Sequence, residues 1–216
     1  MMRARAAPAR GGRPSRAQAE KLPERILDAA TQLFLSLGYG ATSIEAVAQR
    51  ARISKRTFYH RFPDKAALFD AVVHRIIERL RPPPGAPIIA GASLEEIFER
   101  LASLILKAAL SEPAIALHRM IVAESARFPK LATIATQQEA SKEAIRLIAG
   151  LLDREARTGN LRVDDSTFAA EQFLHMVITL PQRRALGLGA PMRPAELRAW
   201  PRAVAALFLY GCRGKS

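Results

Sequence analysis

The sequence predicts an all-α protein of about nine helices. Almost every segment after residue 20 repeats its apolar side chains at intervals of three and four residues, which is the period of an amphipathic helix. No segment alternates apolar and polar residues for long, so strands are not expected. Apolar residues make up 49% of the 216 residues and charged residues 25%, ordinary values for a globular protein with a sizeable core.

The first predicted helix covers residues 22–37, where the apolar side chains form one stripe. Pro23 suits its first turn, where a missing N–H costs no hydrogen bond, and Gly38 suits the position just after its end.

Two short helices are predicted next, within residues 42–65. The first opens on residues 42–45, Thr-Ser-Ile-Glu, which fits a capping box. The second begins after Ser54, a good N-cap, and has to end before Pro63. Small residues, Ala48 and Ala51, stand where the two helices would cross. Two short helices joined by three or four residues form the helix-turn-helix geometry.

A longer helix is predicted from about 65 to 80, capped by Asp64. The prolines at 82–84 form the strongest break in the chain. The helices expected beyond it cover about 93–108 (opening on a capping box at Ser93), 113–128, 130–157, 165–186 (capped by Asp165) and 194–210. Pro181 and Pro201 fall inside the last two and are expected to kink or end them.

The net charge is strongly positive and unevenly distributed. The chain has 33 Lys and Arg against 20 Asp and Glu, a formal net charge of +13, and residues 1–65 hold 13 of the basic and 5 of the acidic side chains. This balance predicts a polyanionic partner, nucleic acid first and an anionic membrane surface second. Residues 1–20 are expected to be a disordered basic tail, which either solubilises the protein or reaches DNA phosphates or a minor groove.

Composition and motifs exclude several classes of protein. Cys212 is the single cysteine, so neither a disulfide scaffold nor a cysteine-based metal cluster is expected. No apolar run approaches the roughly 20 residues of a spanning helix and no secretory signal is recognisable, so a cytoplasmic protein is expected. We find no nucleotide-binding loop, hydrolase elbow or zinc-protease motif, and His118 and His175 are not spaced as metal ligands. We therefore predict no enzyme, no metal site and no cofactor.

The second short helix carries the functional signal. Phe58 and Phe62 can face the core, which leaves a side made of hydrogen-bond donors: Lys55, Arg56, Thr57, Tyr59, His60 and Arg61. Lys and Arg suit phosphates and guanine edges, and a threonine suits phosphate or thymine. A merely solvated basic face is the alternative. The shortness of the helix and the charge clustered around it favour nucleic acid.

Residues 26–73 resemble the DNA-binding domain of TetR-family transcriptional regulators. The matching features include Phe34, Gly38 and Tyr39 at the end of the first helix, the Thr-Ser pair at 42–43, and residues 57–59 of the recognition helix. The resemblance implies a homodimer whose paired recognition helices enter successive major grooves of a near-palindromic operator. It implies DNA contacts from Ser43, Lys55, Arg56, Thr57, Tyr59, His60 and Lys65.

Two positions depart from the family pattern. Arg52 stands in the turn where the family often has glycine, which puts the turn geometry in question, and Arg56 replaces a frequent glycine of the recognition helix. Glu45 matches a position that touches DNA in some members, but its negative charge removes it as a phosphate contact.

Residues 87–216 resemble the family's regulatory domain more weakly, and Met120–Ala132 resembles the branch with an AefR-like C-terminal domain. The resemblance implies an effector cavity among the helices from 113 to 180 and dimerisation through the last two helices. Candidate effector-site residues, which mix apolar bulk with polar tips, are His118, Met120, Phe173, His175 and Met176. The predicted division is a tail at 1–20, a helix-turn-helix domain at 21–66, a connecting helix at 67–84 and a regulatory domain at 85–216.

The sequence therefore predicts a sequence-specific transcriptional regulator, a ligand-responsive repressor that binds double-stranded DNA as a homodimer. The expected mechanism is a population shift, in which an unidentified small molecule changes the separation of the recognition helices through the helix at 65–80. A TetR-like activator, or a DNA-binding protein without an effector, stays open. A membrane-surface protein is disfavoured because residues 1–20 hold too much Pro and Gly for an amphipathic basic helix.

Overall fold

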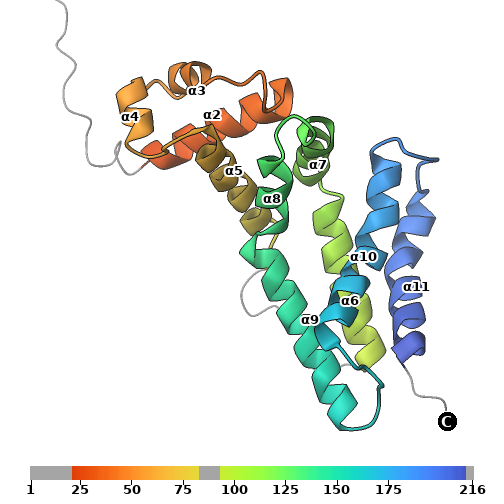
Figure 1. Cartoon of the computed structure of the whole chain (residues 1–216). Helices are drawn as coiled ribbons and strands as arrows, with labels where there is room; N and C mark the ends of the chain where they lie inside the picture. The colour runs from red at the N-terminus through yellow and green to blue at the C-terminus, as the bar shows by residue number, and fades with distance from the viewer. Residues whose placement is uncertain (1–20, 83–92, 213–216) are drawn as a thin grey trace, which may run out of the picture.

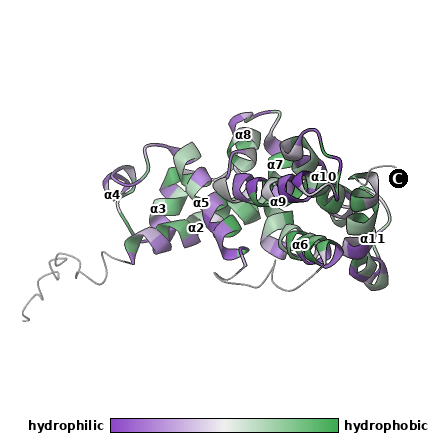
Figure 2. Cartoon of the chain, turned by 90° about the horizontal axis from the view of Figure 1, so that it is seen from below, coloured by the Kyte–Doolittle hydropathy of each residue, from purple (hydrophilic) through white to green (hydrophobic). Residues whose placement is uncertain are grey.

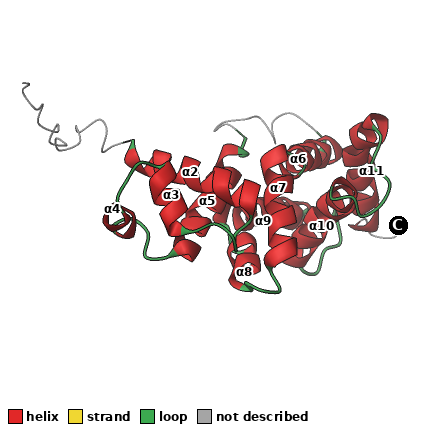
Figure 3. Cartoon of the chain, turned by 90° about the horizontal axis from the view of Figure 1, so that it is seen from above, coloured by secondary structure: helices red, strands yellow, loops and turns green. Residues whose placement is uncertain are grey.

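The computed structural model describes residues 21–82 and 93–212, and these residues form ten helices and no strand (Figures 1 and 3). The helices are α2 (Leu22–Leu37), α3 (Ile44–Arg50), α4 (Lys55–Tyr59), α5 (Lys65–Arg79), α6 (Leu94–Ala109), α7 (Glu112–Glu124), α8 (Lys130–Thr136), α9 (Glu139–Arg157), α10 (Ser166–Ala185) and α11 (Pro194–Cys212). The all-α prediction is confirmed. The predicted tail at 1–20 and most of the proline break lie outside the described residues.

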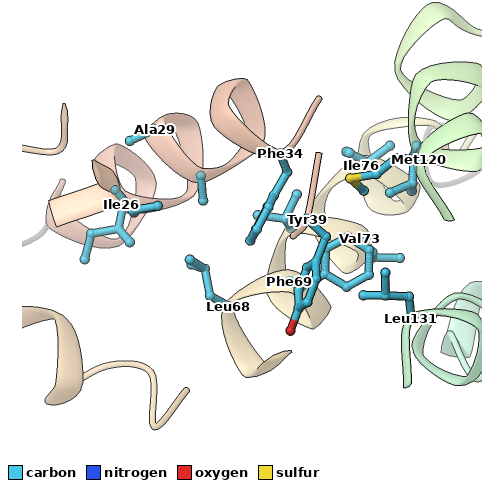
Figure 4. Packing of buried hydrophobic residues seen from close by; sticks show 14 of the residues in the cluster. Ile26, Ala29, Phe34, Tyr39, Leu68, Phe69, Val73, Ile76, Met120 and Leu131 are labelled. Atoms are coloured by element: carbon cyan, nitrogen blue, oxygen red, sulfur yellow. The ribbon is translucent and has the colours of Figure 1, made fainter. Parts of the chain in front are cut away.

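The helices pack around two separate hydrophobic cores. The first lies among α2, α3, α4 and α5 and also takes in α7 and α8 (Figure 4). Phe34, Tyr39 and Phe69 form its centre, with ring centroids 5.4 to 5.7 Å apart. Met120 of α7 and Leu131 of α8 close it from the other side. The predicted helix-turn-helix domain therefore shares its core with α7 and α8 of the predicted regulatory domain.

The second core lies among α6, α9, α10 and α11. Three phenylalanines form its centre, Phe98, Phe173 and Phe208, with ring centroids 4.9 to 5.5 Å apart. Figure 2 shows green, apolar stretches along α6 and α11 of this group. α4 and α11 lie at opposite ends of the molecule in every view (Figures 1, 2 and 3).

The prediction of one helix over 130–157 is wrong. The chain breaks between α8 and α9 at Gln138, which is extended (φ −65°, ψ 133°) and only 6% exposed. Its side-chain amide donates to Asp70 Oδ1 at 3.0 Å and to the carbonyl of Ile134 at 2.8 Å. A hydrogen bond to α5 thus holds a break that the apolar period does not reveal, and the described residues form ten helices instead of about nine. The helix predicted over 113–128 also ends earlier than expected, at Glu124.

Pro181 and Pro201 were expected to kink or end their helices, but α10 and α11 both continue past them. A proline at 181 leaves the carbonyl of Val177 without its intrahelical donor. Trp200 Nε1 donates to that carbonyl at 2.9 Å, so α11 supplies the missing hydrogen bond. Pro181 is therefore tolerated inside α10, because α11 donates the hydrogen bond that the Val177 carbonyl would otherwise lack.

Side-chain caps begin most of the helices that were predicted to have them. Four predicted N-caps accept a hydrogen bond from the backbone N–H three residues later: Ser54, Asp64, Ser93 and Asp165. Ser93 forms a full capping box with Glu96. The capping box predicted over 42–45 is wrong, because Ser43 is the N-cap and Ala46 stands at the third helical position. Thr42 is buried instead and donates to the carbonyl of Gly38 at 2.7 Å.

Candidate nucleic-acid interface

Hydrogen bonds hold the turn between α3 and α4. The N–H of Ile53 donates to the carbonyl of Ala48 at 2.9 Å, and Arg25 of α2 donates to the carbonyl of Ala51 at 2.5 Å. Ala48 and Ala51 are each 3% exposed, so the small residues predicted at the helix crossing are buried there. The two helices are therefore fixed to each other and to α2.

Arg52 holds the glycine-like conformation of this turn. Its φ is 53°, in the left-handed region that costs a residue with a Cβ about 1–2 kcal/mol and costs glycine nothing sterically. The side chain is exposed. The departure from the family pattern therefore leaves the turn in a left-handed conformation and adds a cation beside it.

α4 presents a row of exposed donors. Phe58 is fully buried and fixes the rotation of this five-residue helix. The side chains of Lys55, Arg56, His60 and Arg61 are exposed, Thr57 is half-buried, and Tyr59 is 53% exposed although it is aromatic. The donor face predicted from the sequence is present.

Hydroxyl groups at the starts of α3 and α4 already act as caps. Ser43 Oγ accepts from the N–H of Ala46 at 3.1 Å, and Ser54 Oγ accepts from the N–H of Thr57 at 3.1 Å. The hydroxyls of Ser54 and Thr57 lie 2.8 Å apart. A hydroxyl that accepts in a cap keeps its own O–H as a donor, so exposed Ser43 can cap α3 and contact a phosphate together.

Lys55 forms an ion pair with Glu45 of α3, and both side chains are more than half exposed. The hydrogen bond between them lowers the pKa of Glu45 and raises the pKa of Lys55. The pair links α3 to α4 across the outer surface. Sequence reasoning set Glu45 aside because of its charge, and the structure gives it this role.

Lys65 lies at the start of α5, and its ammonium is hydrogen-bonded to backbone carbonyls of the loop between α2 and α3. Nζ donates to the carbonyls of Tyr39 at 2.7 Å and Thr42 at 2.9 Å. It also lies 4.3 Å from the centroid of the Tyr39 ring, and burial lowers the pKa of Lys65. These contacts give Lys65 a place in the scaffold of the loop between α2 and α3. The DNA contact expected of it stays a prediction.

The five residues predicted for an effector site lie in four different surroundings. Met120 belongs to the first core and Phe173 to the second. His118 is half-buried on α7, where burial lowers the pKa of the imidazole. His175 and Met176 line an open groove between α10 and α11. The structure therefore does not bring the five together.

The groove between α10 and α11 has a volume of about 280 Å³ and is lined mostly by apolar side chains. Besides His175 and Met176 it is lined by Thr179, Leu180, Arg183, Trp200, Val204 and Leu207. Large apolar side chains of the same two helices are exposed, among them Phe168 at 59%, Leu207 at 64% and Tyr210 at 78%. Clustered apolar surface of this kind marks an interaction site.

Neither a membrane span nor a metal site is apparent in the part of the chain that the structure describes. No single helix there is long and apolar enough to cross a bilayer; α6 and α7 pass that test only as a pair, across a bend of 65°. The same residues contain no group of three or more His, Cys, Asp or Glu that could hold a metal ion.

Two family models match the chain, and between them they cover both halves. The model of the bacterial regulatory proteins of the tetR family matches residues 26–72, and the model of the AefR-like transcriptional repressor C-terminal domain matches residues 96–211, which is more than half of the chain. The chain belongs to the TetR family of transcriptional regulators. In this TetR-family regulator, α3 and α4 are therefore the DNA-binding helix-turn-helix.

Solved structures and curated relatives agree with this assignment. The flavonoid-responsive regulator FrrA is 34% identical, with a TM-score of 0.74 over 91% of this chain and 100% of that one. A TetR-family regulator from Mesorhizobium loti is 27% identical, with a TM-score of 0.71 over 91% of this chain and 99% of that one. The uncharacterised HTH-type regulator YhgD of Bacillus subtilis is 24% identical over 155 residues, 72% of this chain and 80% of its own.

Proposed function

We propose that this TetR-family regulator is a ligand-responsive repressor that works in the cytoplasm and binds a near-palindromic operator as a homodimer. The observation that carries the proposal is a pair of unlike surfaces at opposite ends of the molecule, the donor face of α4 and the apolar face of α10 and α11 (Figure 1). DNA phosphates and base edges need donors, and a second protomer needs apolar surface.

The proposed DNA contacts come from the helix-turn-helix and the start of α5: Ser43, Lys55, Arg56, Thr57, Tyr59, His60 and Lys65. Arg56 is the candidate for reading a base, because an exposed guanidinium can donate two parallel hydrogen bonds to a guanine edge. Lys55 would exchange its carboxylate partner, Glu45, for a phosphate. Tyr59 and Ser43 offer hydroxyls that contact the backbone of any sequence.

Dimerisation is proposed through α10 and α11 of both protomers. Leu207 is 64% exposed beside a groove whose lining is mostly apolar, so a second copy of the same two helices would bury it in a four-helix arrangement. α4 lies at the other end of each protomer, which leaves both recognition helices free to face DNA (Figure 3).

A small-molecule effector is proposed to bind in the regulatory half and to shift the population of domain arrangements. Among the predicted effector-site residues, half-buried His118 suits this role best, because burial lowers its pKa and so favours the neutral imidazole, which can donate or accept. Flavonoids are the first ligand class to test, because FrrA is flavonoid-responsive and 34% identical.

Selection of bound sequences from a random duplex library, followed by titration against salt, tests the proposal. We expect a near-palindrome with half-sites about one helical turn apart, bound by two protomers. Addition of an effector should weaken that binding, and placing the operator over a promoter should lower transcription. Binding without any preferred sequence, lost steeply as salt rises, would contradict base reading by α4. Higher transcription from the same promoter would make the protein an activator.

A further inference from the structure

The loop between α2 and α3 is held from the regulatory half of the chain. Glu124, the last residue of α7, directs its carboxylate at this loop. Oε1 accepts from the N–H of Tyr39 at 2.6 Å, and Oε2 accepts from the N–H of Gly40 at 2.5 Å. Hydrogen bonds from backbone N–H groups to a carboxylate belong to the strong, charge-assisted class. One side chain thus binds two adjacent backbone amides of the loop across 84 and 85 positions of sequence.

The same loop is held from the other side by α5. Lys65 Nζ donates to the carbonyls of Tyr39 and Thr42, so the loop gives its N–H groups to an anion and its carbonyls to a cation. The Tyr39 ring packs against Phe128, four residues after Glu124, with ring centroids 5.0 Å apart. The loop therefore has little freedom to move independently of α7.

Glycine at position 40 makes room for the carboxylate. A Cβ added to Gly40 would lie 2.9 Å from Glu124 Oε2 and 3.3 Å from the Phe128 ring. Gly40 is not among the glycines with a positive φ, so its backbone would accept an alanine, but the added carbon would require the Glu124 carboxylate to move. The loop and the end of α7 are therefore complementary in shape at Gly40.

From this geometry we propose that Glu124 is a positioning residue for DNA recognition, which fastens the loop between α2 and α3 to α7 and so orients α3 and α4. Ser43, the N-cap of α3, follows Gly40 by three residues, so a displacement of α7 passes to the DNA-facing surface through a short, bonded segment. This inference rests on the DNA contacts proposed above. It assigns a physical role to Met120–Ala132, the segment that resembles the AefR-like branch.

The substitution Glu124→Gln tests the proposal in the full-length protein. Glutamine keeps the shape and one acceptor, but it turns an NH₂ donor toward the second backbone N–H. Glu112→Gln is the matched control, because it makes the same charge change at the exposed start of the same helix. Both changes make the protein more positive, which by itself favours DNA binding. We expect Glu124→Gln to weaken operator binding about tenfold and Glu112→Gln not to weaken it.

Amide hydrogen exchange at residues 38–43 of the free protein is the second readout. We expect faster exchange of the Tyr39 and Gly40 amides in Glu124→Gln and wild-type exchange in the control. The salt dependence of binding should stay unchanged in both, because neither side chain contacts a phosphate in the proposal.

Gly40→Ala tests the same contact from the other side without changing the charge. Its methyl group should displace the carboxylate, weaken operator binding and speed the Tyr39 amide exchange. The double variant should bind no more weakly than the weaker single variant, because both changes remove one interaction.

Unchanged operator affinity or unchanged amide exchange in folded Glu124→Gln and Gly40→Ala would overturn the role of Glu124. Failure of the wild-type protein to select any sequence would instead overturn the proposed DNA contacts, so the two failures are distinguishable.

Discussion

The two ends of the molecule differ in what their exposed side chains can bind. At the α4 end, the exposed groups are donors such as Arg56 and His60, carried on helices whose caps and turn are hydrogen-bonded. At the α10–α11 end, the exposed groups are large and apolar, with Leu207 and Tyr210 at 64% and 78% exposure. The α4 end therefore suits a polyanion, and the α10–α11 end suits a second apolar protein surface.

The cores behind these two surfaces also differ. The core behind α4 extends across the predicted domain boundary into α7 and α8, whereas the core behind α10 and α11 lies within the regulatory half. A change in the first core is therefore expected to affect DNA binding directly, and a change in the second to affect it through stability and assembly.

The largest expected effect comes from Phe58→Ala, which removes a fully buried ring from the first core. Truncation of a buried phenylalanine costs about 3–5 kcal/mol of unfolding free energy. Phe98→Ala makes the same change in the second core, where Phe98 is also fully buried. Thermal unfolding and operator binding of both variants test whether the two cores affect DNA binding differently. We expect Phe58→Ala to lose operator binding even where the chain is still folded, and Phe98→Ala to keep binding at temperatures below its unfolding. Equal losses in the folded state would contradict the separation.

The second prediction concerns the apolar face. Leu207→Glu should leave the protomer folded, because the side chain is 64% exposed, and should place a charge in the proposed dimer interface. Sedimentation should then report a monomer, with operator affinity about 100-fold weaker, or roughly 2.7 kcal/mol. Leu147→Glu is the control, because it makes the same change at an exposed leucine of α9, and it should leave the protein dimeric. A dimeric Leu207→Glu protein would place the interface elsewhere.

The third prediction concerns the donor face. Arg56→Ala should weaken operator binding by about 1–3 kcal/mol and relax the preference at one base-pair position, if Arg56 reads a guanine edge. Arg154→Ala, an exposed arginine of α9, removes the same charge from a distant helix. Repeating the selection of bound sequences with both variants checks this. A uniform loss over all sequences would make Arg56 a backbone contact.

Sequence reasoning predicted the fold where the determinants are local. The N-cap side chains of Ser54, Asp64 and Asp165 each accept a hydrogen bond from the N–H three residues later. A short window of sequence therefore contains the whole interaction. The break at Gln138 depends on Asp70, and the continuity of α10 through Pro181 depends on Trp200. Those partners lie far away in sequence, and apolar periodicity cannot reveal them.

The same distinction applies to the functional surfaces. The donor face of α4 could be predicted because one buried phenylalanine fixes which side of a short helix is exposed. The predicted effector-site residues scatter over two cores, a groove and a half-buried position on α7, because residue type alone does not predict which side chains contact one another. Sequence reasoning missed Glu124 for the same reason. Its partners are backbone amides in the loop between α2 and α3, and apart from Gly40 nothing in the sequence marks them.

The smallest expected effect tests the turn that presents the donor face. Arg52 adopts φ 53°, so Arg52→Gly removes a conformational cost of about 1–2 kcal/mol from the folded state. Glycine also gives the unfolded chain more conformational entropy, which lowers stability by about 0.5–1 kcal/mol. The expected net gain is about 0.5 kcal/mol of unfolding free energy, measured by denaturant titration. Arg52→Val carries a β-branched side chain into the same conformation and should lower stability, while Arg52→Asn should lie between the two. All three substitutions remove one positive charge, so a stability order of Gly, Asn, Val would report the cost of the left-handed backbone alone. Operator affinity should fall slightly and equally in all of them. A destabilised Arg52→Gly would show that the arginine side chain stabilises the turn by more than its left-handed backbone costs.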